Sequence, residues 1–369
     1  MTATDLPERK AYLRQQRAEH RRSLLGVFPA VYPREILWSL NILPVEIWDP
    51  PMQSGSSAGH LPPNTCDVAC RGLELILQGH CDELDGFLFP HTCDTIQNLA
   101  SIVNDTLGSG KPCFFFHPPR VSDSKAARAF YHRQLESLAS ELQRRFGGPF
   151  NAEILAASVK LGQRVDGAIR EIYALRAQDR LDVGNSEFYG ILRAGEYLHP
   201  DDYLPLLMQL RKMAGPAGRH PTPVVLGGVL PSPPAFLDLL DDLDLRIAAD
   251  DLLNCSRRLL VPAGPLEDPL QELTDRYFRM PVCPTRHSTL QQRVDRLLNL
   301  VESTRAAGVI FYVVPFCDPE LFDLPPLVAA LGKEGIRTLV VEAGLNRQLS
   351  GQVAVRLEAF AEMIGSGGR

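Results

Sequence analysis

Two stretches in which short apolar runs alternate with helical patterns constrain the fold of this sequence most. In the first stretch, unbroken apolar runs at 85–90 and 113–116 predict buried strands, each next to a segment with helical spacing. In the second stretch, strands are predicted at 224–228, 308–314 and 338–342. Strands that alternate with helices run parallel, because each helix returns the chain to the same edge of the sheet. The sequence therefore predicts an α/β fold with two parallel sheets.

The first alternating stretch opens with an arginine-rich segment. Residues 9–25 have the pattern of a basic amphipathic helix, which we expect to be a solvated helix rather than a docking surface for an anion. After it, the sequence predicts a strand, a helix that opens near Pro33, and a second strand from Val45 to Trp48.

Between the two alternating stretches lies a segment with helical patterns only. It contains NAEILAASVKLGQRVDGAIREIYALR, SEFYGILRAGEYL and PDDYLPLLMQLRKMAG, and it ends in the Gly/Pro-rich linker GPAGRHPTP. We therefore predict three domains: an N-terminal α/β domain over 1–150, a helical domain over 151–220 and a C-terminal α/β domain over 221–369.

Charge and hydropathy exclude several classes of partner. The 38 Lys and Arg residues against 44 Asp and Glu residues give a net charge of −6, so no overall basic surface attracts nucleic acid or an anionic membrane. No apolar run approaches the ~20 residues of a membrane helix, and the N-terminus MTATDLPERK is polar where a signal peptide is apolar. We expect a cytoplasmic protein without nucleic-acid or membrane partners.

Eight cysteines are the candidates for chemistry. In the reducing cytoplasm a cysteine is a buried apolar side chain, a catalytic thiolate or a metal ligand rather than half of a disulfide. The eight are Cys66, Cys70, Cys81, Cys93, Cys113, Cys255, Cys283 and Cys317.

Two of these cysteines occupy equivalent positions in the two α/β stretches. Cys93 follows the predicted strand 85–90 and precedes a helix, and Cys317 follows the strand 308–314 in the same way. Ligands bind beyond the carboxyl ends of parallel strands, and a helix N-terminus favours a thiolate. Cys66 also lies near a helix start, within reach of the same crevice. If the three are not simply core thiols, three thiolates suit an iron–sulfur cluster or zinc, with one metal position left open for water or substrate.

Other familiar motifs fail in their context. GSSAG at 55–59 matches a hydrolase nucleophile elbow but lies in a Pro-rich loop with no strand before it. LGSGKP at 107–112 lacks the first glycine and the final Ser or Thr of a phosphate loop. The sequence also has no dinucleotide fingerprint and no paired C-x-x-C zinc motif.

Several longer segments resemble a known family. They are YPREILWSLNILPVEIW, NTCDVACRGLELIL, DGFLFPHTCDTIQNLA, GVIFYVVPFCDPELFDLP and GQVAVRLEAFAEM. They resemble the subunits of 2-hydroxyacyl-CoA dehydratases and the related ATP-dependent benzoyl-CoA reductases. The resemblance spans nearly the whole chain and is specific for the family but not for a substrate.

This resemblance implies a fold, a cofactor and partners. The fold is two flavodoxin-like domains with a helical domain, and the cofactor is one [4Fe–4S] cluster per chain. Its ligands here are Cys66, Cys93 and Cys317, so that one iron is not ligated by cysteine. The implied partners are a paralogous subunit or a second copy of the chain, an acyl-CoA thioester substrate, and a separate ATP-dependent iron–sulfur activator that delivers low-potential electrons.

The implied reaction is either dehydration of an (R)-2-hydroxyacyl-CoA to the 2-enoyl-CoA or one-electron reduction of an aromatic acyl-CoA.

Two alternatives to this family function stay open. If Cys255 and Cys283 join the other three cysteines, the chain resembles the double-cubane cluster proteins, which reduce small molecules. The chain could also be a non-catalytic subunit that only relays electrons.

The remaining candidate residues favour structural roles. We expect Cys70 and Cys113 to be packing thiols, and we expect His91 and Glu46 to serve in capping or core hydrogen bonds rather than in proton transfer. No catalytic acid or base is assigned from the sequence.

Overall fold

The computed structural model describes residues 6–53, 55–108, 110–216, 221–345 and 348–365. Outside the described residues lie 1–5, position 54 before the GSSAG motif, position 109 within the LGSGKP motif, 217–220 of the predicted linker, 346–347 and 366–369. The predicted domain boundary at 220/221 adjoins that linker, and both domain boundaries stay predictions. Among the described residues, no helix combines the length and the apolar character that crossing a membrane requires.

The first α/β unit is built on a parallel sheet with the strand order β2-β1-β3-β4. The strands β2 and β3 are buried along their whole length, and β1 is buried from Leu24 onward, so apolar residues face helices on both sides. The four strands are β1 (Ser23–Val27), β2 (Ile42–Glu46), β3 (Gly86–Pro90) and β4 (Cys113–Phe116).

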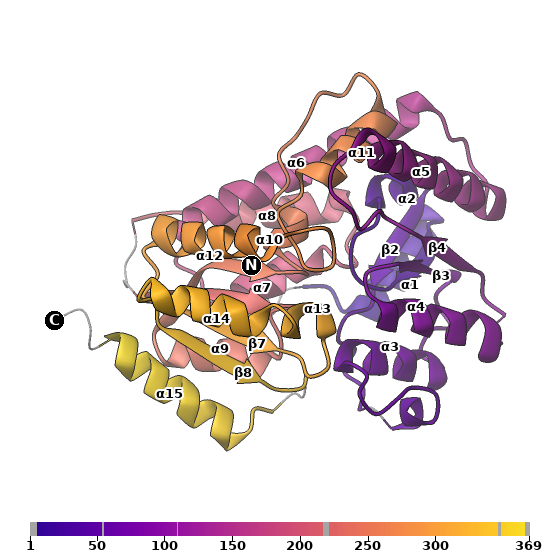
Figure 1. Cartoon of the computed structure of the whole chain (residues 1–369). Coiled ribbons are helices and arrows are strands. Elements are labelled where there is room, and N and C mark those ends of the chain that lie inside the picture. Colours follow the sequence, from indigo (N-terminus) through magenta and orange to yellow (C-terminus); the bar gives the residue numbers. More distant parts are fainter. Residues whose placement is uncertain (1–5, 54, 109, 217–220, 346–347, 366–369) are drawn as a thin grey trace.

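Helices cover both faces of this sheet. Figure 1 shows α3 and α4 along one side and α2 and α5 along the other. A short 3-10 turn (Ser56–Gly59) precedes α3, and a π-helical turn (Ile102–Thr106) extends α4. The helices of this unit are α1 (Arg9–His20), α2 (Arg34–Ser39), α3 (Asp67–Leu77), α4 (Asp94–Ser101) and α5 (Lys125–Phe146).

The second α/β unit repeats this plan with the parallel order β6-β5-β7-β8. One face of its sheet packs against α12 and α14, and the other packs against α9 and α15. The strands are β5 (Thr222–Gly228), β6 (Leu245–Leu252), β7 (Gly308–Val313) and β8 (Thr338–Glu342). The helices are α9 (Pro234–Asp242), α10 (Ser256–Leu259), α11 (Pro269–Arg279), α12 (Leu290–Thr304), α13 (Asp318–Leu321), α14 (Leu324–Lys333) and α15 (Gly351–Gly365).

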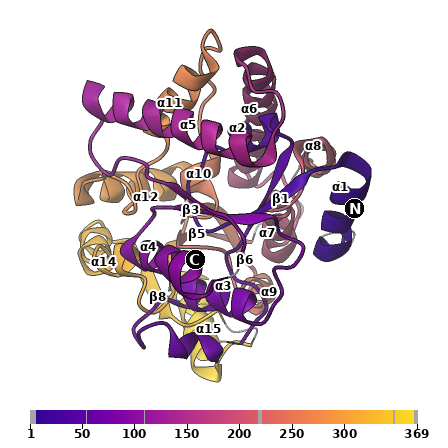
Figure 2. The same cartoon turned by 90° about the vertical axis from the view of Figure 1, so that its right-hand side faces the viewer.

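The helical segment between the units packs against both of them. It consists of α6 (Ala152–Ala177), α7 (Asn185–Ala194) and α8 (Pro200–Lys212). Helix α6 contacts α2 of the first unit and β6 of the second. Helix α11 of the second unit lies beside α5 of the first, where Tyr131 and Tyr277 stack with ring centroids 4.3 Å apart (Figure 2).

The predicted fold class is confirmed, with local differences at the first helix and the second strand. The first helix ends at His20 instead of residue 25, because Arg21 adopts a left-handed conformation (φ 53°) and β1 begins at Ser23. This helix is also not fully solvated, since Tyr12, Leu13 and Gln16 are buried. The second strand spans Ile42–Glu46 rather than 45–48, because its register is set by pairing with β1.

A buried ion pair joins the two α/β units. Glu46 at the end of β2 receives Arg258 of α10 on both carboxylate oxygens, at 2.8 and 2.7 Å. The Trp48 indole N–H and the Tyr32 hydroxyl also donate to this carboxylate. Burial acts to raise the pKa of Glu46, but the Arg258 guanidinium and these donors hold that pKa below its usual value. The sequence-based preference for a core hydrogen-bonding role of Glu46 therefore agrees with its contacts.

The substitution Glu46→Gln should destabilise the chain by about 3 kcal/mol, because it leaves Arg258 buried without a counter-charge. Glu83→Gln is the control, since Glu83 pairs with Arg14 at the surface and its loss costs less than about 1 kcal/mol. Urea unfolding of both variants measures the difference. An equal loss of stability in the two variants would contradict a role of the Glu46 pair in joining the units.

Candidate functional site

The three cysteines singled out from the sequence lie at the start of three helices. Cys66 is the N-cap residue of α3, Cys93 that of α4 and Cys317 that of α13. Cys93 and Cys317 each follow a strand at the carboxyl edge of its sheet, β3 in the first unit and β7 in the second. The repeated position that the sequence predicts is therefore present in the structure.

All three thiols line one cavity of about 340 Å³ between the two units. Cys66 and Cys93 come from the first unit, and Cys317 comes from the second. The other lining residues are Asp94, Thr95, Arg120, Pro284, Ser288, Phe316, Asp318, Pro319, Phe322 and Asp323. The cavity thus exists only when the two units are held together.

The electrostatics of the three thiols are coupled. Burial, with a smaller contribution from the neighbouring Cys93, raises the pKa of Cys66 to about 12. Burial also raises the pKa of Cys317 well above its ordinary value, and Glu320, Cys66 and Cys93 add to that shift. Without a cation in the cavity, these thiols are therefore protonated at neutral pH.

Cys93 has the most favourable surroundings for a thiolate. Burial raises its pKa, but the backbone N–H groups of Ile96 and Thr95 and the Arg120 guanidinium oppose that rise. Arg120 lies in the loop after β4, 3.7 Å from the Asp94 carboxylate. A bound cation would complete the stabilisation, since a thiol that coordinates a metal is deprotonated outright.

Within the described residues, no group of three or more His, Cys, Asp or Glu side chains is placed to hold a single metal ion.

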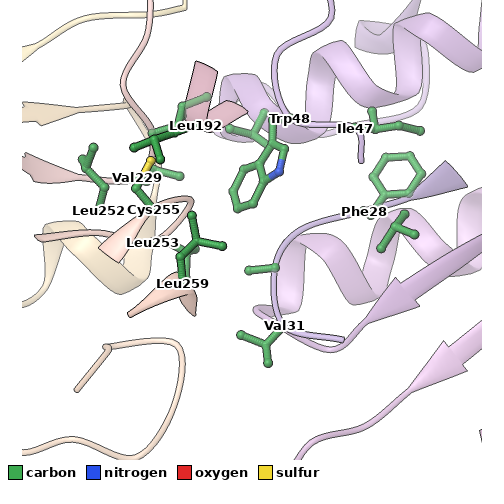
Figure 3. Close-up of a cluster of buried hydrophobic side chains, with 14 of the residues drawn as sticks. Phe28, Val31, Ile47, Trp48, Leu192, Val229, Leu252, Leu253, Cys255 and Leu259 are labelled. Carbon is green, nitrogen blue, oxygen red and sulfur yellow. The ribbon is translucent and has the colours of Figure 1, made fainter. Parts of the chain in front are cut away.

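The other candidate cysteines lie elsewhere. Cys255 is 1% exposed and contacts the Asn254 side chain at 3.3 Å. Figure 3 shows its sulfur among apolar side chains, with Leu192 and Val229 nearby. Cys283 is equally buried and contacts the Thr285 hydroxyl at 3.1 Å. Neither is among the described residues that line the cavity.

Cys70 and Cys113 are partly buried thiols whose sulfurs contact backbone carbonyls, and neither lines the cavity among the described residues. His91 packs edge-on against His117 and lies 3.8 Å from Asp94, beside the cavity rather than in its lining. Glu46 belongs to the ion pair with Arg258.

Sequence reasoning missed several lining residues. Arg120 follows β4 at the same sheet edge as Cys93, so the rule that located the cysteines could also have located Arg120. Pro284 and Ser288 come from the irregular segment between α11 and α12, which has no pattern that places it at the site. Phe316 and Phe322 flank Cys317 and are 47% and 80% exposed.

The family model described as 2-hydroxyglutaryl-CoA dehydratase, D-component, matches residues 29–364. The chain belongs to this family. It is 27% identical to the beta subunit of (R)-2-hydroxyglutaryl-CoA dehydratase from Acidaminococcus fermentans, over 96% of each chain. It is 24% identical to the beta subunit of lactoyl-CoA dehydratase from Anaerotignum propionicum, over 94% of this chain and 93% of that relative.

A reductase subunit is similar to a comparable degree. This relative is one of the subunits of benzoyl-CoA reductase from Thauera aromatica, 26% identical over 84% of this chain and 82% of its own length. The family resemblance stated from the sequence is confirmed. Because these relatives are subunits of dehydratases and of a reductase, the expectation of an enzyme subunit of lyase or oxidoreductase type is confirmed as well.

The loop before Cys66 depends on a buried carboxylate. Glu74 of α3 accepts the backbone N–H groups of Gly55, Ser56 and Ser57 at 3.0, 3.3 and 3.0 Å. Burial acts to raise the pKa of Glu74, but these N–H groups lower it to about 2. The interaction therefore holds the GSSAG segment on α3, which fits its prediction as a loop rather than a nucleophile elbow.

Because the folded-state pKa of Glu74 is depressed, its contribution to stability is present above its ordinary pKa of 4.5 and is lost as the pH falls towards 2. Wild-type chain should therefore lose more stability than Glu74→Gln over this interval. The free energy of unfolding measured against pH checks this, with the exposed Glu334→Gln as control. Parallel curves for wild type and Glu74→Gln would contradict the assigned interaction.

Proposed function

We propose that this chain is the iron–sulfur subunit of an enzyme that acts on CoA thioesters. The observation that carries the proposal is the convergence of Cys66, Cys93 and Cys317, from two α/β units, on one cavity. Membership of the dehydratase family supports the substrate class, since the relatives are named as subunits of enzymes for acyl-CoA compounds. The reaction is dehydration of an (R)-2-hydroxyacyl-CoA to the 2-enoyl-CoA or one-electron reduction of an aromatic acyl-CoA.

The cofactor we propose is one [4Fe–4S] cluster held by the three thiolates, with one iron free of cysteine. When bound, the cluster supplies single low-potential electrons and an open coordination position. The cavity of about 340 Å³ offers room for a group larger than one ion. Cys66, Cys93 and Cys317 each give up a proton on binding, so cluster assembly should be favoured by rising pH.

The chain's own residues define the surroundings of that group. Arg120 places a positive charge beside Cys93 and balances part of the charge of three thiolates. Pro284 and Phe316 add apolar surface to the lining, which limits the access of water. Backbone N–H groups at the starts of α3 and α4 face the sulfurs of Cys66 and Cys93.

A single cluster is better supported than a double one. Cys255 and Cys283 have protein partners and are not among the described residues that line the cavity. Recruiting them would require both side chains to leave buried positions.

The electron-relay role differs from catalysis only in lacking an acyl-CoA site. Titration of the chain with acyl-CoA thioesters therefore separates these two roles.

The partners we propose follow the relatives. Each relative is named as one subunit of a larger enzyme, so we propose that this chain works with a paralogous subunit, a second copy being the other possibility. An ATP-dependent iron–sulfur activator is the further partner that we propose. A cytoplasmic location suits such a site, since free thiols persist in a reducing compartment.

Substituting either Cys93 or Cys317 with Ala should abolish cluster assembly and leave the chain folded, because the neighbouring residues lose only a thiol. Iron and acid-labile sulfide per chain, measured after purification without oxygen, check this. The matched controls Cys113→Ala and Cys255→Ala should keep about four irons. Full iron content in the Cys93 or Cys317 variant would refute the ligand assignment, and a loss of iron in Cys255→Ala would favour the double cluster.

Turnover should require reductant, ATP and the activator together, because the proposed reaction needs an electron of low potential. The assay combines the chain with its partner subunit and follows 2-hydroxyacyl-CoA dehydration and benzoyl-CoA reduction. Omission of any one component should abolish activity. Sustained turnover in the absence of ATP and activator would exclude the proposed mechanism.

A further inference from the structure

A buried ion-pair network lies behind the segment that carries Cys317. Glu320, three residues after Cys317, is 6% exposed and receives Arg257 through both terminal nitrogens. The Arg293 guanidinium donates to the same carboxylate at 3.1 Å. The side chains of Arg257 and Arg293 are 0% and 1% exposed, so Glu320 is held by two fully buried cations.

The network anchors this segment to other parts of the second unit. Arg257 of α10 also donates to Asp251 near the end of β6 at 2.7 Å. Arg293 of α12 also donates at 2.9 Å to Asp323, which lines the cavity. The segment 317–323 is therefore fixed at two points, Glu320 and Asp323, to elements that carry none of the three cavity thiols.

The Cys317 segment needs such an anchor, because its own structure is weak. Phe316 adopts φ 61°, a left-handed conformation that is unfavourable for a residue with a side chain. Its ring is half exposed, so burial of the ring does not offset that cost. Helix α13 has only four residues, Asp318–Leu321, which is too short to be stable alone.

Glu320 is also linked directly to Cys317. Its backbone N–H donates to the Cys317 carbonyl at 3.0 Å and faces the Cys317 sulfur as well. A shift of the Glu320 side chain therefore moves the N–H group that defines the position of this thiol. Cys66 and Cys93 belong to the first unit and are positioned by α3 and α4 instead.

We propose that Glu320, held by Arg257 and Arg293, is a positioning residue that sets the Cys317 thiol against Cys66 and Cys93. The inference rests on the proposed function, in which these three thiols bind one cluster. Buried ion pairs add little net stability compared with apolar packing, so a role in fixing geometry accounts better for so costly a network.

The test measures thiol proximity in the metal-free chain with dibromobimane, which becomes fluorescent when it bridges two neighbouring thiols. In wild type it should join Cys317 to Cys66 or Cys93, as identified by peptide mass spectrometry. Glu320→Gln keeps the shape of the side chain but removes its charge. It should lower this yield by about tenfold, because Arg257 and Arg293 then pair only with Asp251 and Asp323 and no longer hold the Glu320 side chain by charge. The matched control Glu334→Gln changes an exposed carboxylate and should react like wild type.

Equal yields in wild type and Glu320→Gln, or no bridge in wild type, would overturn the proposal. If Glu320→Gln does not fold, Glu320→Asp replaces it, because it keeps the charge and shortens the reach. A yield equal to that of wild type in Glu320→Asp would then overturn the proposal.

A second readout uses the chain reconstituted with iron and sulfide. Glu320→Gln should alter the electron paramagnetic resonance spectrum of the reduced cluster, whereas Glu334→Gln should not. An unaltered spectrum in Glu320→Gln would overturn the proposal. If wild type binds no iron, the proposed function fails, while the bridging yield still decides the positioning role of Glu320.

Discussion

The contact between the two α/β units is the constraint on which the candidate site depends. Neither unit holds all three thiols, so their spacing follows from how the units are joined. The bidentate pair between Arg258 and Glu46 is one such joint. Asp49 of the first unit forms another, since its carboxylate accepts the Ser232 hydroxyl of the second unit and also binds Arg193 of the helical segment. Buried charges that are paired across a junction tolerate little displacement, because separation leaves each charge unpaired in a poorly solvated place.

The surroundings of the three thiols combine burial with groups that favour a thiolate, which suits the proposed role as cluster ligands. Burial raises the pKa of each thiol and keeps it protonated, while helix starts and Arg120 favour the thiolate once a metal ion arrives. In the proposed site the three thiols are thus neutral without metal, and they would gain negative charge only when the cluster binds. A preformed cluster of three thiolates would be far more costly to hold between two apolar cores.

Much of the fold could be predicted from the sequence, because buried parallel strands have a distinctive pattern. The runs CFFF and TLVVE coincide with β4 and β8 without a shift. The end of α1 and the start of β2 could not be predicted as well, since they depend on a left-handed Arg21 and on the pairing of β2 with β1. Local propensity does not determine such tertiary effects.

The candidate site was predictable where it follows a topological rule. Cys93 and Cys317 were found because each follows a strand at the carboxyl edge of a parallel sheet. The network behind Cys317 was not predictable, because Arg257, Arg293 and Glu320 are distant in sequence and resemble ordinary surface charges. Only their burial reveals that they act together.

Mössbauer spectroscopy of the chain loaded with isotopically enriched iron is the most direct test of whether three cysteines from two units hold one cluster with one iron free of cysteine. We expect about four irons per chain, of which about one in four gives a distinct signal that shifts when a small ligand is added. A mononuclear signal, or about eight irons with no distinct site, would contradict it.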